Sequence, residues 1–113
     1  MLENKDRTQP SSLFAPALNN TEQRAKIFAA LSDPTRLRIV EMLATKEEIS
    51  SSEIANQTGI SLALFCHHSK ILAEAGVIQT RKDGQTKYHS LNREILVTCF
   101  SSIGGAGCIF PGQ

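Results

Sequence analysis

The chain has 113 residues, with 12 Lys and Arg against 11 Asp and Glu, and its formal net charge of +1 argues against a non-specific polycationic binder of nucleic acid. The length suits one domain and is too short for an enzyme with a separate cofactor domain. No run of about 18 apolar residues is present and the start, MLENKDRTQP, is polar. We therefore expect a globular, cytoplasmic protein with no membrane partner.

The positive charge is concentrated in one internal block. Residues 61–93 contain five Lys and Arg against Glu74 and Asp83, together with all three histidines. The flanking segments, residues 1–60 and 94–113, each carry a net charge of −1. The near-neutral total therefore hides a basic surface that is confined to one part of the chain.

The first predicted helix spans residues 21–31. Residues 1–20 have no sustained apolar period and predict an N-terminal arm, and Asn20 can cap the helix that follows. The stripe expected to face the core contains Ala25, Phe28, Ala29 and Leu31.

A second helix is predicted from Pro34 to about Ala44. Asp33 can accept hydrogen bonds from its first free amides, and Pro34 lacks the N–H that would be unsatisfied at this position. The helix is expected to leave Arg36 and Glu41 outside. It is expected to bury Leu37, Val40 and Leu43, or their neighbours.

The next two helices have strong capping signals. Ser50 and Glu53 form a capping box, in which the hydroxyl accepts from the Glu53 amide and the carboxylate reaches back to the Ser50 amide. Gly59 is expected to stop this short helix. Ser61 then caps a helix that Gly76 stops. Two helices separated by three or four residues predict a helix-turn-helix.

The apolar period changes after Gly76. Residues 77–81 and 86–91 predict a hairpin around Lys82-Asp83-Gly84-Gln85, because Asp-Gly favours a tight turn. Asn92 can cap a last helix, and residues 104–113 predict a Gly-rich tail. The apolar stripe of the last helix contains Ile95, Leu96, Cys99, Phe100 and Ile103.

The helix after the turn has the outward face that a helix needs to enter the major groove of DNA. A helical wheel places five residues on its inward side, flanked by Leu64 and Ile71: Phe65, His68, Leu72, Ser61 and Ala75. Small, cationic and hydrogen-bonding residues lie opposite. Taken alone, this helix face could simply be solvated, and so could the basic hairpin. A helix-turn-helix followed directly by a basic hairpin is better explained by a nucleic-acid interface. The residues predicted to contact DNA are Ser61, Ala63, Cys66, His67, Lys70, Arg81, Lys82 and Lys87.

Four segments together resemble the ArsR/SmtB family of winged helix-turn-helix repressors: FAALSDPTRLRIV from Phe28, the pair His67-His68, LAEAGVI from Leu72, and YHSL from Tyr88. The resemblance covers about residues 21–103. It implies a mainly α fold with a two-stranded β wing, and a homodimer joined through its first and last helices. It also implies binding to double-stranded operator DNA and release by an inducer, often a metal ion. The expected dimer contacts are Phe28, Ile95, Leu96, Cys99, Phe100 and Ile103.

The chain departs from the family pattern at both familiar metal sites. Residues 49–53 contain no thiol where some members have a Cys-x-Cys pair, and residues 92–113 contain no His and only one carboxylate, Glu94. Ser69 stands where the family has a core Leu. We expect either a local loosening of the helix packing or a hydrogen bond from the Ser69 hydroxyl to the Phe65 carbonyl.

The three cysteines, Cys66, Cys99 and Cys108, are the remaining candidates for an inducer site. Three thiolates suit a soft acceptor such as As(III), Cd(II) or Pb(II), and they equally suit oxidation, with Cys99 and Cys108 as the more plausible pair. The odd count predicts reduced thiols rather than a disulfide framework. The alternative is that Cys99 is a buried apolar residue and Cys108 a passive thiol of the tail.

The sequence thus predicts a dimeric repressor with one winged-helix domain, residues 21–103, whose inducer is sensed through thiols. A ligand-independent winged-helix dimerisation module is the alternative, which absence of salt-dependent DNA binding would favour. An enzyme with Cys66 as nucleophile and His67 as base is disfavoured, because adjacent side chains on a helix diverge and no third orienting group is present.

Overall fold

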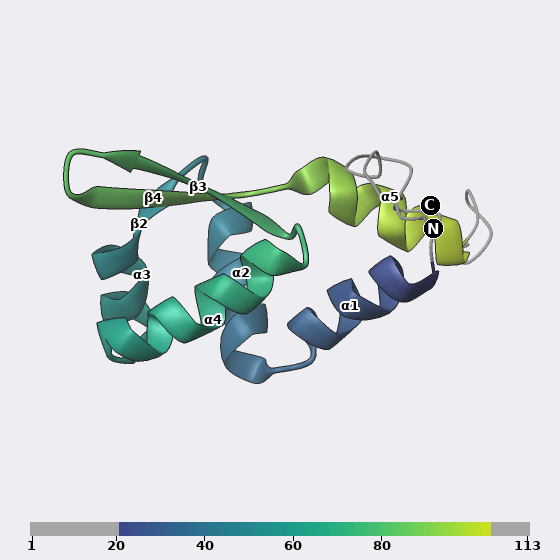
Figure 1. The fold of residues 1–113 in the computed structure, drawn as a ribbon, viewed down its shortest axis with the longest axis horizontal. Helices are drawn as coiled ribbons and strands as arrows, with labels where there is room; N and C mark the ends of the chain where they lie inside the picture. The colour runs from purple at the N-terminus through teal and green to yellow at the C-terminus, as the bar shows by residue number, and fades with distance from the viewer. Residues whose placement is uncertain (1–20, 105–113) are drawn as a thin grey trace, which may run out of the picture.

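The computed structural model describes residues 21–104; the predicted arm and the predicted tail beyond Gly104 lie outside these residues. The described part contains five helices and three short strands. Their order is α1 Thr21–Leu31, α2 Pro34–Ala44, β2 Ile49–Ser50, α3 Ser51–Thr58, α4 Leu62–Glu74, β3 Ile78–Asp83, β4 Thr86–Leu91 and α5 Arg93–Gly104. Figure 1 shows the β3–β4 hairpin above α3 at one end of the molecule, and α1 and α5 at the other. The predicted mainly α fold with a winged helix-turn-helix is confirmed.

The wing is a three-stranded antiparallel sheet in the order β2-β4-β3. Asp83 pairs with Thr86 across a two-residue turn, in which Gly84 has a φ of +65°, a conformation that Gly adopts without strain. β3 therefore extends two residues closer to the turn than predicted, whereas β4 has the predicted bounds. The sequence did not predict β2, because two residues are too few to show an alternating period.

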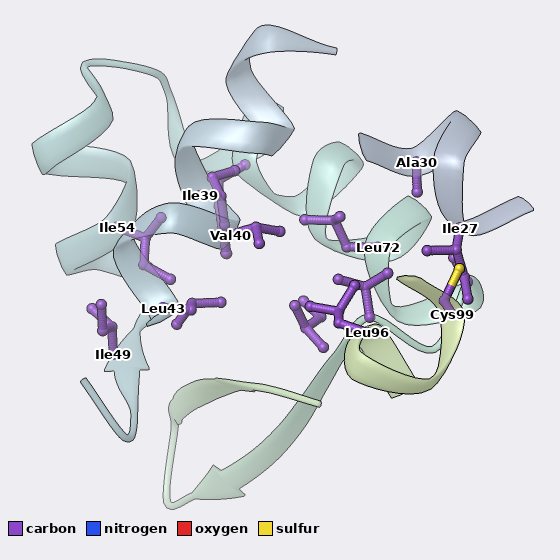
Figure 2. Packing of buried hydrophobic residues seen from close by; sticks show 14 of the residues in the cluster. Ile27, Ala30, Ile39, Val40, Leu43, Ile49, Ile54, Leu72, Leu96 and Cys99 are labelled. Carbon is purple, nitrogen blue, oxygen red and sulfur yellow. The ribbon is translucent and has the colours of Figure 1, made fainter. Parts of the chain in front are cut away.

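The hydrophobic core is one cluster with side chains from all five described helices, as Figure 2 shows. On α1 the buried residues are Ile27 and Ala30, whereas Ala25, Phe28 and Ala29 are exposed, so the predicted stripe was wrong. The helix carries two apolar faces, and it is the one with Ile27 that packs against the rest of the chain. Phe28 instead lies beside Phe100 of α5, with ring centroids 6.0 Å apart.

Helix α2 also differs from the prediction on both of its faces. Ile39, Val40 and Leu43 are buried, but Leu37 is 42% exposed. Arg36, expected outside, turns inward: its Nε donates to the Ala30 carbonyl at 2.7 Å, which ties α2 to the end of α1. These contacts depend on how the helices pack, which the apolar spacing within one helix does not encode.

No helix within residues 21–104 is long and apolar enough to cross a membrane.

Candidate nucleic-acid interface

The turn between α3 and α4 is fixed by side-chain caps. Ser50 Oγ accepts from the Glu53 amide at 3.2 Å, and Ser61 Oγ accepts from the Leu64 amide at 3.0 Å. Gly59 ends α3 with a φ of +75°, the left-handed region that other residues resist. The Glu53 carboxylate does not return to Ser50 as predicted; it accepts from Lys46 and Gln57 at 3.3 and 3.0 Å. The caps leave the amino-terminal turn of α4 at the surface.

The outward face of α4 has the exposure that the sequence predicted. Phe65, His68 and Leu72 are buried beneath it, whereas Leu64, expected at the flank of the inward side, is 43% exposed. Ser61, placed on the inward side by the wheel, is exposed too. The predicted DNA contacts of this region, Ser61, Ala63, Cys66, His67 and Lys70, are all exposed.

His68 connects α4 to α2. Its Nδ1 lies 3.2 Å from Arg36 Nη1, and since a guanidinium only donates, Nδ1 accepts and the proton of the neutral ring is on Nε2. Burial lowers the pKa of His68; the charge of Asp33 opposes this shift and that of Arg36 adds to it. A neutral His68 is therefore part of the packing that sets the position of α4.

Ser69 forms a hydrogen bond within α4, but to a different carbonyl from the one predicted. Its Oγ donates to the carbonyl of Cys66 at 3.1 Å, one residue closer than the predicted acceptor, Phe65. The hydroxyl is thus satisfied within the helix itself. Residue 69 is half-buried, so a polar group is tolerated there.

An open groove of about 290 Å³ lies between α4, the start of α3 and the wing. Leu62 and Cys66 line it from α4, and Lys87 lines it from β4. Leu62 is 52% exposed and was not among the predicted contact residues. The available signal was a Leu at the first helical position, outside the stripe defined by Phe65 and Leu72.

Arg81, predicted as a DNA contact, is paired with another residue of the chain, although its side chain is 55% exposed. Its Nε and Nη2 donate to the two carboxylate oxygens of Glu48 at 2.7 and 2.8 Å, and its guanidinium carbon lies 4.7 Å from the centre of the Tyr88 ring. The hydrogen bond from Arg81 lowers the pKa of Glu48. Arg81 thus fastens β3 to the segment before β2.

Lys82 and Lys87 differ from Arg81. They are directly opposite each other in the hairpin and both are exposed. Neither has an ion pair within residues 21–104. Two like charges in register destabilise a hairpin unless an anion lies over them.

His89 joins the wing to the helix-turn-helix and was not predicted as important. It is 2% exposed, with Nε2 at 2.7 Å from Ser51 Oγ and Nδ1 at 3.0 Å from Thr80 Oγ1. Its ring meets that of Phe65 edge-on at 5.0 Å. Burial, and then the charge of Lys87, lower its pKa. No local sequence signal identifies it, because its partners lie on three other elements.

The cysteines lie in different environments. Cys66 is exposed on α4, whereas Cys99 is fully buried in the core and burial raises the pKa of its thiol. Cys108 lies outside the described residues. Among residues 21–104, no three His, Cys, Asp or Glu side chains come together as a metal site. The burial of Cys99 supports the alternative in which it is a buried apolar residue of the core.

The predicted dimer contacts divide into two groups. Leu96 and Cys99 are buried in the core of the chain itself and Ile95 is half-buried. The exposed apolar side chains are Phe28, Phe100 and Ile103, with Val97, which was not predicted, at 39%, 46%, 57% and 63% exposure. All four belong to α1 and α5.

Known proteins with the same pattern have related sequences and folds. A helix-turn-helix domain family matches residues 31–81. The uncharacterised HTH-type transcriptional regulator YceK of Bacillus subtilis is 42% identical over 76 residues, which cover 66% of this chain and 76% of that protein. The crystal structure of an ArsR family transcriptional regulator superposes with a TM-score of 0.67 at 29% identity, covering 74% of this chain and 84% of the other. The chain belongs to the ArsR/SmtB family of winged helix-turn-helix regulators.

A second relative of this ArsR/SmtB member is named as a repressor. The transcriptional repressor SdpR of Bacillus subtilis is 39% identical over 70 residues, which cover 62% of this chain and 77% of that protein. The ArsR/SmtB protein is accordingly a DNA-binding transcriptional repressor and not an enzyme.

Proposed function

We propose that the protein represses transcription in the cytoplasm by binding a double-stranded operator as a homodimer, with α4 and the wing of each protomer on the DNA. The observation that carries this proposal is the groove between the exposed face of α4 and the wing, with Lys87 on one side. The amino-terminal turn of α4 would reach base edges, and the wing lysines would contact phosphates. The two copies of α4 would then lie one DNA turn apart, about 34–36 Å.

Helices α1 and α5 form the proposed dimer contact. Phe28 of α1 and three residues of α5, Val97, Phe100 and Ile103, expose apolar side chains. Figure 1 shows α1 and α5 at the end of the molecule opposite the wing. Covering this surface with a second copy would remove it from water and leave both α4 helices free. Residues 21–103 would thus carry both dimerisation and DNA binding.

A thiol response is the second part of the proposal, and within the described residues it rests on Cys66. This side chain is exposed and lines the groove, so a metalloid, soft metal or oxidant attached to its sulfur would occupy the space that DNA needs. Cys99 would act as a packing residue, since its thiol is buried. Cys108 is the other candidate thiol.

The test is binding to a fluorescent duplex that the protein itself selects from a randomised pool. We expect affinity to fall steeply with salt, and Lys70→Ala to weaken binding. The matched control is Lys26→Ala, an exposed lysine on α1, which should bind as the wild type does. If no duplex is selected, or if binding is insensitive to salt, the chain acts as a dimerisation module and the proposal is wrong.

Dimerisation is tested separately by sedimentation of Phe100→Ser. We expect a monomer that remains folded, because Phe100 is 46% exposed in the single chain. A dimer of unchanged stability would exclude α5 as the interface.

A further inference from the structure

Leu62 has no packing role that explains its position. It is the first residue of α4 and half of its surface is exposed, although the helix already buries Phe65 and Leu72. Single exposed leucines are common on protein surfaces, so exposure alone carries no function. The neighbours of Leu62 make its position informative.

Leu62 lies at the end of a ridge on α4. Leu62, Cys66 and Lys70 are spaced four residues apart and therefore follow one line along the helix surface. The ridge is apolar at its amino-terminal end and cationic one turn beyond Cys66. In a helix that enters the major groove, the first turn meets base edges and the later turns approach the backbone.

The groove beside this ridge has two kinds of wall. Leu62 and Cys66 form an apolar side on α4, and Lys87 supplies a cation from the wing. The remaining lining residues are polar and uncharged: Ser51, Ser52, Gln85 and Thr86. An occupant that fits both walls has an anionic edge next to a small apolar group. Duplex DNA has this combination, because the only apolar group in its major groove is the C5-methyl of thymine, and phosphates border the groove.

We propose that Leu62, with Cys66 beside it, contacts the C5-methyl group of a thymine in each operator half-site, and that this contact is a determinant of sequence specificity. The inference rests on the proposed function, since it assigns a base to the same interface. It predicts that the protein distinguishes thymine from deoxyuridine, which forms the same base pair without the methyl group.

The experiment uses the selected duplex, with each thymine in turn replaced by deoxyuridine in both half-sites. We expect one symmetric position at which the replacement weakens binding by about fourfold for each half-site, about fifteenfold in total, as expected for uncovering one methyl group. Leu62→Ala should bind the thymine and deoxyuridine duplexes alike at that position. Its affinity should therefore fall more on the thymine duplex than on the deoxyuridine duplex.

Leu64→Ala is the matched control. It removes the same side chain two residues along, 43% exposed and about 200° around the helix, outside the groove. This variant should keep the full thymine preference. A preference lost in Leu64→Ala and kept in Leu62→Ala would overturn the assignment.

Failure of the inference differs from failure of the proposed function. Salt-dependent binding with no thymine position sensitive to deoxyuridine would refute the methyl contact and leave the operator proposal intact. A change of oligomeric state in Leu62→Ala, with the thymine preference unchanged, would show that the groove is occupied by protein instead. Absence of any DNA binding would refute both.

Discussion

The facing lysines of the wing give a prediction in which DNA affinity and the stability of the free hairpin change in opposite directions. Lys82 and Lys87 pair in register on β3 and β4, without an acidic partner in the described part of the chain. Replacing Lys82 with Ala should weaken DNA binding and at the same time make the free hairpin more stable. A lysine with only a solubilising role would leave DNA binding unchanged and give the gain in stability alone.

Both magnitudes follow from the geometry. One phosphate contact contributes about 0.9 to the slope of log affinity against log salt, so its loss from both protomers lowers the slope by about 1.8. Between about 50 and 200 mM salt, this difference corresponds to about a tenfold change in relative affinity. Removing one of two like charges that face each other should stabilise the hairpin by about 0.2–1 kcal/mol.

The assay is fluorescence anisotropy of the selected duplex over a series of salt concentrations, with urea unfolding of the free protein. The comparison variant is Arg81→Ala, in which the lost cation is already paired with Glu48. We expect a smaller change in salt slope for Arg81→Ala and a less stable wing. A slope unchanged by Lys82→Ala but reduced by about two in Arg81→Ala would refute the reasoning, because the Glu48 pair would then have to open on DNA.

Two further predictions concern His68 and the cysteines. The lowered pKa of His68 means that the unfolded chain binds a proton at this residue more readily, so stability to urea should fall as pH drops below 6.5. The fall should be smaller in His68→Gln, and equal pH profiles for wild type and His68→Gln would contradict this. Iodoacetamide should label Cys66 in the native protein and Cys99 only in denaturant, as measured by peptide mass spectrometry. The labelled wild-type protein should lose DNA binding, whereas Cys66→Ser should keep it after the same treatment. Native labelling of Cys99 would show that the α1–α5 packing opens.

The helix boundaries could be predicted because their causes are local. The caps Asp33, Ser50 and Ser61 bond amides two or three residues away, and Gly59 acts through its own backbone. Such signals are present in a short window of sequence, and the structure places each where it was expected.

The inward faces were predicted less well because their causes are distant. Ile27 and Phe28 are equally apolar, and only the packing of α1 determines that Ile27 is buried. Arg36 looks like a solvated residue until His68, 32 residues later, is brought beside it. For the candidate site, exposure along α4 was predictable from the helical period. The ion pair between Arg81 and Glu48 was not predictable, since 33 residues separate the two.

The anchoring of the wing bears on how so nearly neutral a protein can bind DNA. With a net charge of +1 per chain, we expect non-specific attraction to a duplex to be weak, so that affinity has to come from a few contacts held in place. His89 and Arg81 hold the wing against α3 and the segment before β2, at the cost of using one of the wing's own cations. The lysines left free then act from a fixed position relative to Leu62. Specificity in this repressor would thus arise from the rigidity of the groove rather than from the amount of charge around it.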